Sequence, residues 1–171
     1  MKFKNIVLVG MMGSGKSSVA KLLAQKLGFK IIDLDILFEQ QQGMKISDYF
    51  SFYSEEKFRE IETQLLKENI FKEDVIISTG GGVVLKKENQ ELLFNSEIFS
   101  VFLKANRDEI YDRIKNDNSR PLLKVENVKG RISEILQSRE KFYSLAKFQI
   151  DTNQKEIIKV VDEIVELWKK Y

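Results

Sequence analysis

Short runs of apolar and β-branched residues alternate along the chain with segments in which apolar residues recur every three or four positions. Runs of the first kind are typical of buried strands, and segments of the second kind are typical of amphipathic helices. The expected strands are residues 6–9, 29–34, 75–79 and 98–103, with a shorter fifth at 148–150. Strands that alternate with helices predict right-handed β-α-β units and a parallel sheet covered by helices on both faces.

The helical spacing is clearest behind the first strand, where an apolar stripe runs from Val19 to Leu27 and Gly28 is the expected C-terminal cap. The other expected helices carry Phe58, Ile61 and Leu65; Ile110 and Ile114; Val128 through Tyr143 to Ala146; and Ile157 to Trp168. Turn-forming residues and the single proline interrupt the pattern at 116–121, where we expect a loop. The prediction is an α/β fold of three layers with a central, mostly five-stranded parallel sheet and a mobile lid at about 115–128.

Composition narrows the possible chemistry. A chain of 171 residues is the size of one domain, so we expect a single domain over 1–171. Its 28 basic and 26 acidic side chains are dispersed, which disfavours nucleic acid as a partner, and no apolar run is long enough for a membrane span. Cysteine and histidine are absent, which excludes disulfides, thiol nucleophiles, Ser-His-Asp hydrolysis and most zinc sites.

The basic and apolar start of the chain could be taken for a secretory signal. Its apolar run is short, however, and continues into Gly-Ser-Gly-Lys in place of a small-residue cleavage site. We therefore expect a cytoplasmic protein.

Directly behind the first strand, the residues from Gly10 to Ser17 match the P-loop pattern G-x-x-x-x-G-K-[ST]. Glycines let successive backbone N–H groups point at phosphate oxygens, and the following helix adds the positive end of its dipole. In such a loop Lys16 reaches the β- and γ-phosphates, and the Ser17 hydroxyl binds Mg²⁺. A plain glycine turn requires neither the lysine nor the hydroxyl, so we expect binding of ATP or GTP.

Two carboxylates follow the second strand, at the sheet edge where ligands of open α/β sheets bind. Asp33 and Asp35 are two residues apart, so on a strand they share a face and can project into one cleft. One would support Mg²⁺ while the other contacts a hydroxyl of the acceptor. In isolation a solvated strand end would be an equal interpretation; the nearby P-loop favours the functional one.

Three consecutive glycines, Gly80, Gly81 and Gly82, follow the third strand at the same edge. An ordinary turn needs one or two glycines, whereas three allow a ligand to approach bare backbone closely. Arginine is scarce beside lysine, which makes its positions informative, because a guanidinium forms the planar fork that binds carboxylate and phosphate. The arginines of interest are Arg59, with Glu62 three residues on to hold it, Arg120 in the expected loop, and Arg139 in the long helix.

Together these motifs resemble the shikimate kinase family of small P-loop kinases, over nearly the whole chain. The matching elements are residues 10–17; Asp33-Leu34-Asp35; Phe58-Arg59 with Glu62; residues 78–82; Arg120-Pro121-Leu122-Leu123; and Arg139 with Tyr143 and Ala146. The family often has a proline shortly before that tyrosine, whereas this chain reads Arg-Glu-Lys-Phe-Tyr, so this element matches less well.

The resemblance implies transfer of the ATP γ-phosphoryl group to the 3-hydroxyl of shikimate, giving shikimate 3-phosphate and ADP in the route to chorismate and the aromatic amino acids. The implied cofactor is Mg²⁺, the implied small molecules are ATP and shikimate, and a monomer is the default. The resemblance also implies a substrate-binding segment at about 33–62. The implied ATP-binding residues are Gly13, Ser14, Gly15, Lys16, Ser17, Ser18, Arg113 and Arg120. Ser17 and Asp33 would hold the metal, with Asp33 acting directly or through water.

For the acceptor, the resemblance implies that Arg59 and Arg139 grip the carboxylate and that the backbone of Gly80, Gly81 and Gly82 lines the ring. Asp35 would contact the ring hydroxyls and orient, or accept a proton from, the attacking oxygen. Lys16 and Arg120 would complete the catalytic set with Asp35.

Two alternatives remain at this point. The acceptor could be another polyol such as gluconate, or a nucleoside monophosphate, although no separate pocket for a second nucleotide is evident. The chain could also be a nucleotide-dependent regulatory protein without catalysis, against which the complete set of Lys16, Ser17, Asp33, Asp35 and Arg120 argues.

Overall fold

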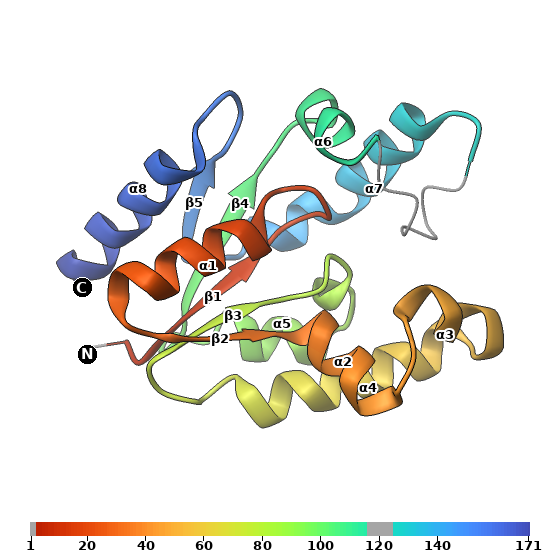
Figure 1. The fold of residues 1–171 in the computed structure, drawn as a ribbon, viewed down its shortest axis with the longest axis horizontal. Coiled ribbons are helices and arrows are strands. Elements are labelled where there is room, and N and C mark those ends of the chain that lie inside the picture. The colour runs from red at the N-terminus through yellow and green to blue at the C-terminus, as the bar shows by residue number, and fades with distance from the viewer. Residues whose placement is uncertain (1–2, 116–124) are drawn as a thin grey trace.

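The computed structural model describes residues 3–115 and 125–171. Within them, five parallel strands form one sheet in the order β2-β3-β1-β4-β5 (Figure 1). The strands are β1 (Asn5–Val9), β2 (Lys30–Asp33), β3 (Val75–Ser78), β4 (Phe99–Lys104) and β5 (Phe148–Asp151). The expected five-stranded parallel sheet is therefore confirmed.

Successive residues of β1 enter different cores, as the alternation of side chains along a strand requires. Ile6 and Leu8 pack with α1 (Lys16–Leu27) and α8 (Ile157–Lys170) on one face of the sheet. Val7 and Val9 belong to the core on the other face, with α4 (Glu55–Asn69) and α7 (Val128–Tyr143). Helices thus cover both faces, which gives the three layers predicted (Figure 1).

Strand register brings the predicted site residues to one edge. Leu8 and Asp33 both pair with Ser78, so the segments that follow β1, β2 and β3 start side by side. They are the P-loop, the segment after Asp33 and the glycine triplet. This edge at the carboxyl ends of the strands is where open α/β sheets bind ligands.

The first helix ends where the sequence predicts. Gly28 adopts the left-handed conformation with φ of 72°, and its N–H donates to the carbonyl of Ala24. Glycine takes this conformation without the steric strain that a Cβ atom imposes.

Two expected boundaries are wrong, and a third expectation is not tested. The second strand ends at Asp33, because its side chain accepts hydrogen bonds from the N–H groups of Asp35 and Ile36 and caps α2 (Leu34–Gln42). Ala146 lies beyond α7, which ends at Tyr143 in a tight turn. Part of the expected lid, with Arg120, lies in 116–124 and therefore outside the described residues.

Several short elements carry no clear apolar stripe and were not predicted. They are α3 (Ile46–Phe52), the 3-10 helix η1 (Val83–Leu85) and α5 (Lys87–Leu93). The remaining short helix, α6 (Arg107–Ile114), was expected. Together with α4, α2 and α3 form one side of the molecule, and α6 and α7 form the other side (Figure 1). Across the two described ranges, none of the helices is long and apolar enough to cross a membrane.

Candidate active site

A cleft of about 1110 Å³ opens at the carboxyl edge of the sheet. Its lining comes from the P-loop, from α2 to α4 on one side and from α6 and α7 on the other. The predicted site residues that line it are Gly13, Ser14, Gly15, Lys16, Ser17, Ser18, Asp33, Asp35, Arg59, Gly80, Gly81, Gly82, Arg113 and Arg139. The structure thus brings together every predicted site residue that it describes.

The P-loop closes around its own lysine. Lys16 is buried, and its Nζ donates to the carbonyl oxygens of Gly10 and Met11 at 2.8 and 3.0 Å. Gly10 has φ of 147°, and a Cβ atom there would lie 2.8 Å from the carbonyl oxygen of Leu103, so glycine is required. The ammonium group is consequently held inside a ring of backbone, where it can neutralise phosphate charge.

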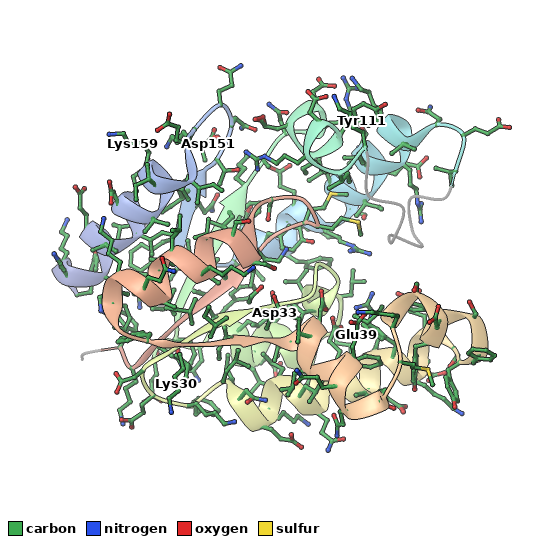
Figure 2. The ribbon with its side chains drawn as sticks, in the orientation of Figure 1. Lys30, Asp33, Glu39, Tyr111, Asp151 and Lys159 are labelled. Carbon is green, nitrogen blue, oxygen red and sulfur yellow. The ribbon has the colours of Figure 1, made fainter. Side chains whose placement is uncertain are left out.

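Ser17 and Asp33 join the start of α1 to the end of β2. The Ser17 hydroxyl donates to Asp33 Oδ2 at 3.0 Å, while Oδ1 of the same carboxylate caps α2 (Figure 2 shows Asp33 where β2 meets α2). A hydroxyl and a carboxylate are the hard oxygen donors that Mg²⁺ prefers, so this pair fits the predicted metal site. In the described part of the chain no group of three or more His, Cys, Asp or Glu side chains could hold a metal ion.

Asp35 lines the cleft as expected, but it belongs to a helix and not to a strand. It lies in the first turn of α2, so the strand alternation that was used to place it beside Asp33 does not apply. Its carboxylate lies against Gly80, where a Cβ atom would be 2.9 Å from Asp35 Oδ1 and 2.7 Å from Glu62 Oε1. Gly80 is therefore needed to let two carboxylates approach the same backbone.

Arg59 projects from α4 and is buried between two acidic side chains of its own helix. Its Nη1 donates to Glu62 Oε2 at 2.7 Å, which confirms the predicted pair three residues apart. Its Nε and Nη2 donate to Glu55 Oε1 at 3.3 and 3.1 Å, a contact not predicted although the four-residue spacing could have indicated it. A Cβ atom on Gly82 would collide with the Arg59 guanidinium, so the triplet also fixes this arginine.

Burial acts on the pKa values of these two side chains in opposite directions, although both pKa values are raised in the end. Burial raises the pKa of Glu62, although the nearby charge and hydrogen bond of Arg59 oppose the shift. Burial by itself disfavours the charged guanidinium, but Glu62 and Glu55 outweigh it and raise the pKa of Arg59. Among the described residues Glu62 Oε1 has no hydrogen-bond partner.

On the opposite wall, Arg139 extends from α7 toward the glycine triplet. Its Nη1 donates to the carbonyl oxygen of Gly81 at 3.1 Å, and the hydroxyl of Tyr143 donates to the same oxygen. Two buried arginines from different helices thus meet one glycine segment, Arg139 at the Gly81 carbonyl oxygen and Arg59 beside Gly82. The resemblance implied that these two arginines, far apart in sequence, bind one carboxylate, and both line the same cleft.

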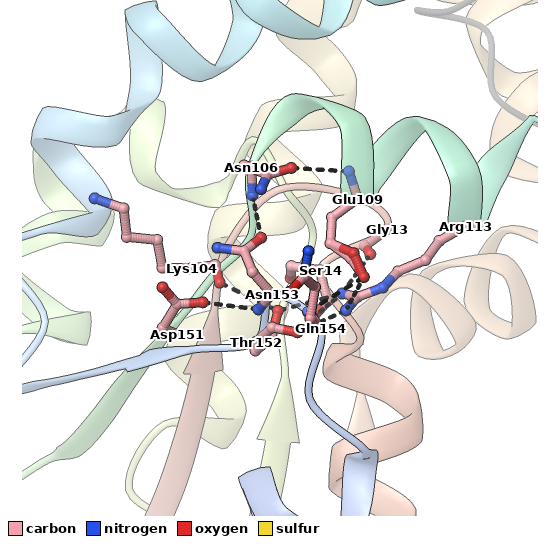
Figure 3. A network of polar contacts seen from close by, with 10 residues as sticks. All are labelled: Gly13, Ser14, Lys104, Asn106, Glu109, Arg113, Asp151, Thr152, Asn153 and Gln154. Atoms are coloured by element: carbon pink, nitrogen blue, oxygen red, sulfur yellow. Dashed lines mark hydrogen bonds and ion pairs between the residues drawn. The ribbon is translucent and has the colours of Figure 1, made fainter.

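Arg113 lies at the other end of the cleft, between the P-loop and the loop after β5 (Figure 3). Its guanidinium donates to Thr152 Oγ1 and to the Thr152 carbonyl oxygen at 3.2 and 2.8 Å, and Nη1 lies 3.4 Å from the carbonyl oxygens of Gly13 and Ser14. Glu109, one helical turn earlier, lies 3.6 Å away. Thr152, Lys155 and Ile157 also line this end of the cleft and were not assigned from the sequence.

Comparisons with known proteins point to one family. A family model described as shikimate kinase matches residues 12–169. A curated relative named shikimate kinase, from Thermodesulfovibrio yellowstonii, is 43% identical over 98% of this chain and 96% of its own length. Another of that name, from Sulfurihydrogenibium sp., is 40% identical over 95% of this chain and 96% of its own length.

Among solved structures, shikimate kinase from Acinetobacter baumannii in complex with shikimate has a TM-score of 0.93 and 32% identity, covering 98% of this chain and 94% of that chain. A gluconokinase from Sinorhizobium meliloti has a TM-score of 0.62 and 16% identity, covering 99% of this chain and 94% of that chain. At 16% identity the second likeness shows a shared fold alone.

Proposed function

The chain belongs to the shikimate kinase family, and from this membership we propose that it transfers the γ-phosphoryl group of ATP to the 3-hydroxyl of shikimate. The products are shikimate 3-phosphate and ADP, in the route to chorismate and the aromatic amino acids. One observation carries the proposal: two buried arginines, Arg59 and Arg139, reach one glycine segment beside a complete P-loop. A site for an anionic polyol next to a site for triphosphate is what this reaction requires.

The P-loop end of the cleft holds the donor. Backbone N–H groups from Gly13 to Ser18 and the ammonium of Lys16 bind the phosphates, and Arg113 lies toward the base. Ser17 would hold Mg²⁺ directly, with Asp33 behind it, and the bound ion would neutralise phosphate charge. The hydrogen bond between these two side chains supports this assignment. Arg120, outside the described residues, is proposed to add a further positive charge at the phosphates.

The acceptor lies between Asp35 and the two arginines. Arg59 and Arg139 bind its carboxylate, and the bare backbone of Gly80, Gly81 and Gly82 lies along its ring. Asp35 accepts a hydrogen bond from the hydroxyl that attacks, orients it, and takes its proton as the new phosphate ester forms. Positioning and charge stabilisation supply most of the rate in phosphoryl transfer, so these groups suffice without histidine or cysteine.

The experiment is a coupled assay of ADP release with Mg·ATP and shikimate, gluconate, AMP or no acceptor. We expect turnover with shikimate alone. Turnover with gluconate or AMP but not with shikimate would refute the assigned acceptor, and no turnover with any acceptor would favour a regulatory protein. The likeness to a gluconokinase is one of fold, and fold does not decide the acceptor.

The proposal includes a monomer that works in the cytoplasm on small molecules, without nucleic acid or membrane as a partner. The absence of cysteine fits a reducing compartment, and the dispersed charges give no surface for a polyanion. The proposal also includes a single domain with a substrate-binding segment at about 33–62 and a lid at about 115–128. Light scattering at several protein concentrations tests the monomer.

A further inference from the structure

The carbonyl oxygen of Gly81 accepts hydrogen bonds from two side chains of α7. Arg139 Nη1 and the Tyr143 hydroxyl both donate to it, and they lie one helical turn apart on the same face of the helix. A carbonyl oxygen has two lone pairs, so these two donors use its full capacity. The direction of this one peptide group is thereby fixed from the side of α7.

The other side of the same residue lies against the P-loop. A Cβ atom on Gly81 would be 3.1 Å from the backbone nitrogen of Met12 and 3.6 Å from the carbonyl oxygen of Gly10. The peptide is therefore wedged between the donor loop and α7. A shift away from α7 would break its bonds to Arg139 and Tyr143 and would press the peptide against the P-loop.

The surroundings of Tyr143 keep its hydroxyl in position to donate to the Gly81 carbonyl. Its ring is fully buried and stacks on Phe102, with ring centroids 5.2 Å apart and an angle of 25° between the rings. Burial raises its pKa to about 12, against the opposing effect of Arg139. The hydroxyl therefore remains a protonated donor throughout the pH range in which kinases are assayed.

Arg139 has to serve both the Gly81 carbonyl and a substrate. A guanidinium carries five N–H groups, so one can bond the carbonyl while a fork of two others faces a carboxylate. That division works only if the carbonyl stays in place, because a fork that is rotated loses one of its two bonds to the carboxylate.

We propose that Tyr143 is a positioning residue for acceptor binding, which holds the Gly81 carbonyl and through it orients the Arg139 guanidinium toward the acceptor carboxylate. The inference rests on the proposed function, since it takes shikimate as the acceptor. Without the hydroxyl, the carbonyl is held by Arg139 alone, and the guanidinium is free to turn with it.

The variant Tyr143→Phe removes the hydroxyl and keeps the ring that stacks on Phe102. We expect the KM for shikimate to rise about tenfold, with kcat and the KM for ATP changed less than about twofold. Tyr111→Phe removes a hydroxyl from a partly buried tyrosine of α6 that does not line the cleft, and should change neither KM. An unchanged KM for shikimate, or an equal rise in both KM values, would overturn the proposal.

A role in stability alone would not depend on the charge of the acceptor. The methyl ester of shikimate lacks the carboxylate, so its KM should be the same in the wild type and in Tyr143→Phe. In the Arg139→Lys background, which has lost the fork, Tyr143→Phe should raise the KM for shikimate no further. Equal weakening of acid and ester, or additive effects of the two substitutions, would show that the tyrosine does not act through Arg139.

Circular dichroism and the Tm of Tyr143→Phe complete the test. A variant that fails to fold would show that the hydroxyl serves stability first, and would also overturn the proposal. The wild-type assay separates the two hypotheses. If the wild type does not phosphorylate shikimate, the proposed function fails; if it does, and the KM ratio is unchanged, only the positioning role fails.

Discussion

Asp33 and Asp35 lie two residues apart, but different neighbours hold them. The oxygens of Asp33 are engaged by the Ser17 hydroxyl and by two N–H groups at the start of α2. Asp35 instead lies against Gly80, within the acceptor end of the cleft. The first aspartate is thus tied to the P-loop serine, while the second lies in the part of the cleft where we propose that the acceptor hydroxyl binds.

Asp35→Asn removes the proton acceptor and keeps the shape of the side chain. We expect kcat to fall by about 100-fold or more while ATP still binds, because general-base catalysis contributes a factor of that order. The coupled assay gives kcat, and calorimetry gives the affinity for ATP. Asp162→Asn, which removes a half-exposed ion pair with Lys26 on the far side of the sheet, is the control. Near-normal turnover of Asp35→Asn would contradict the assigned role.

The buried carboxyl of Glu62 makes stability depend on pH. Because its pKa is higher in the folded than in the unfolded protein, the folded state binds the proton more tightly. The resulting stabilisation is complete below the ordinary value of 4.5 and is lost as the pH rises through the raised pKa.

Glu62→Gln keeps a neutral side chain at every pH and isolates this effect. The free energy of unfolding of the wild type relative to this variant should fall as the pH rises, by at most about 1.4 kcal/mol per pH unit for one proton. Urea unfolding at closely spaced pH values between about 4 and 7 measures it, with NMR titration of the Glu62 carboxyl as the independent check. A difference that grows with pH would show that Arg59 dominates, and a constant one that Arg59 cancels the effect of burial; either would contradict the raised pKa.

Sequence spacing predicts contacts within a helix but not contacts between distant elements. The pair of Arg59 and Glu62 follows from three-residue spacing on α4. The bonds from Arg139 and Tyr143 to Gly81 join residues about 60 positions apart, and those from Arg113 to Thr152 join residues 39 apart. Such contacts depend on the strand order, which the sequence pattern does not give.

At the scale of elements, the strands and long helices could be predicted because their apolar residues have a clear period. The exceptions have a physical cause. The apolar run of β2 continues through Leu34 into α2, so hydrophobicity alone hides the boundary that the Asp33 cap creates. α3 and α5 have seven residues each, too few for an apolar stripe to repeat.

The left-handed conformation of Gly28 at the end of α1 gives a testable prediction about stability. Gly28→Ala should lower the free energy of unfolding by about 1 kcal/mol, because a Cβ atom strains a residue with positive φ even where space is open. Gly28→Asn is the matched control and should lose less, since asparagine tolerates this conformation. Urea unfolding measures both, and kcat should not change. Equal losses for alanine and asparagine would mean that conformation is not the cause.

At the scale of the whole molecule, α4, which carries Arg59, and α8, which carries the single tryptophan, cover different faces of the sheet. Trp168 belongs to α8 and packs on Phe29 and Phe99, while Arg59 belongs to α4. The fluorescence of Trp168 reports on the helices of one face, and a ligand bound near Arg59 acts on the helices of the other face. If the chain is a single domain, as expected, the helices of both faces should unfold together.

A ligand that binds only the folded state raises its stability by about 2.7 kcal/mol at 100 times its Kd. Shikimate at this level should raise the unfolding midpoint, and gluconate at the same concentration should not. If the chain unfolds as one unit, Trp168 fluorescence and far-ultraviolet circular dichroism should report the same shift. A shift by circular dichroism without one at Trp168 would divide the chain into two units.

The glycine triplet leaves no interchangeable position. A methyl group on Gly80 meets two carboxylates, one on Gly81 meets the phosphate-binding loop, and one on Gly82 meets a guanidinium. A side chain would therefore crowd a different neighbour at each position: carboxylates at Gly80, P-loop backbone at Gly81 and a guanidinium at Gly82. In the proposed reaction, this stretch of bare backbone would set the spacing between the phosphate donor at the P-loop and the acceptor.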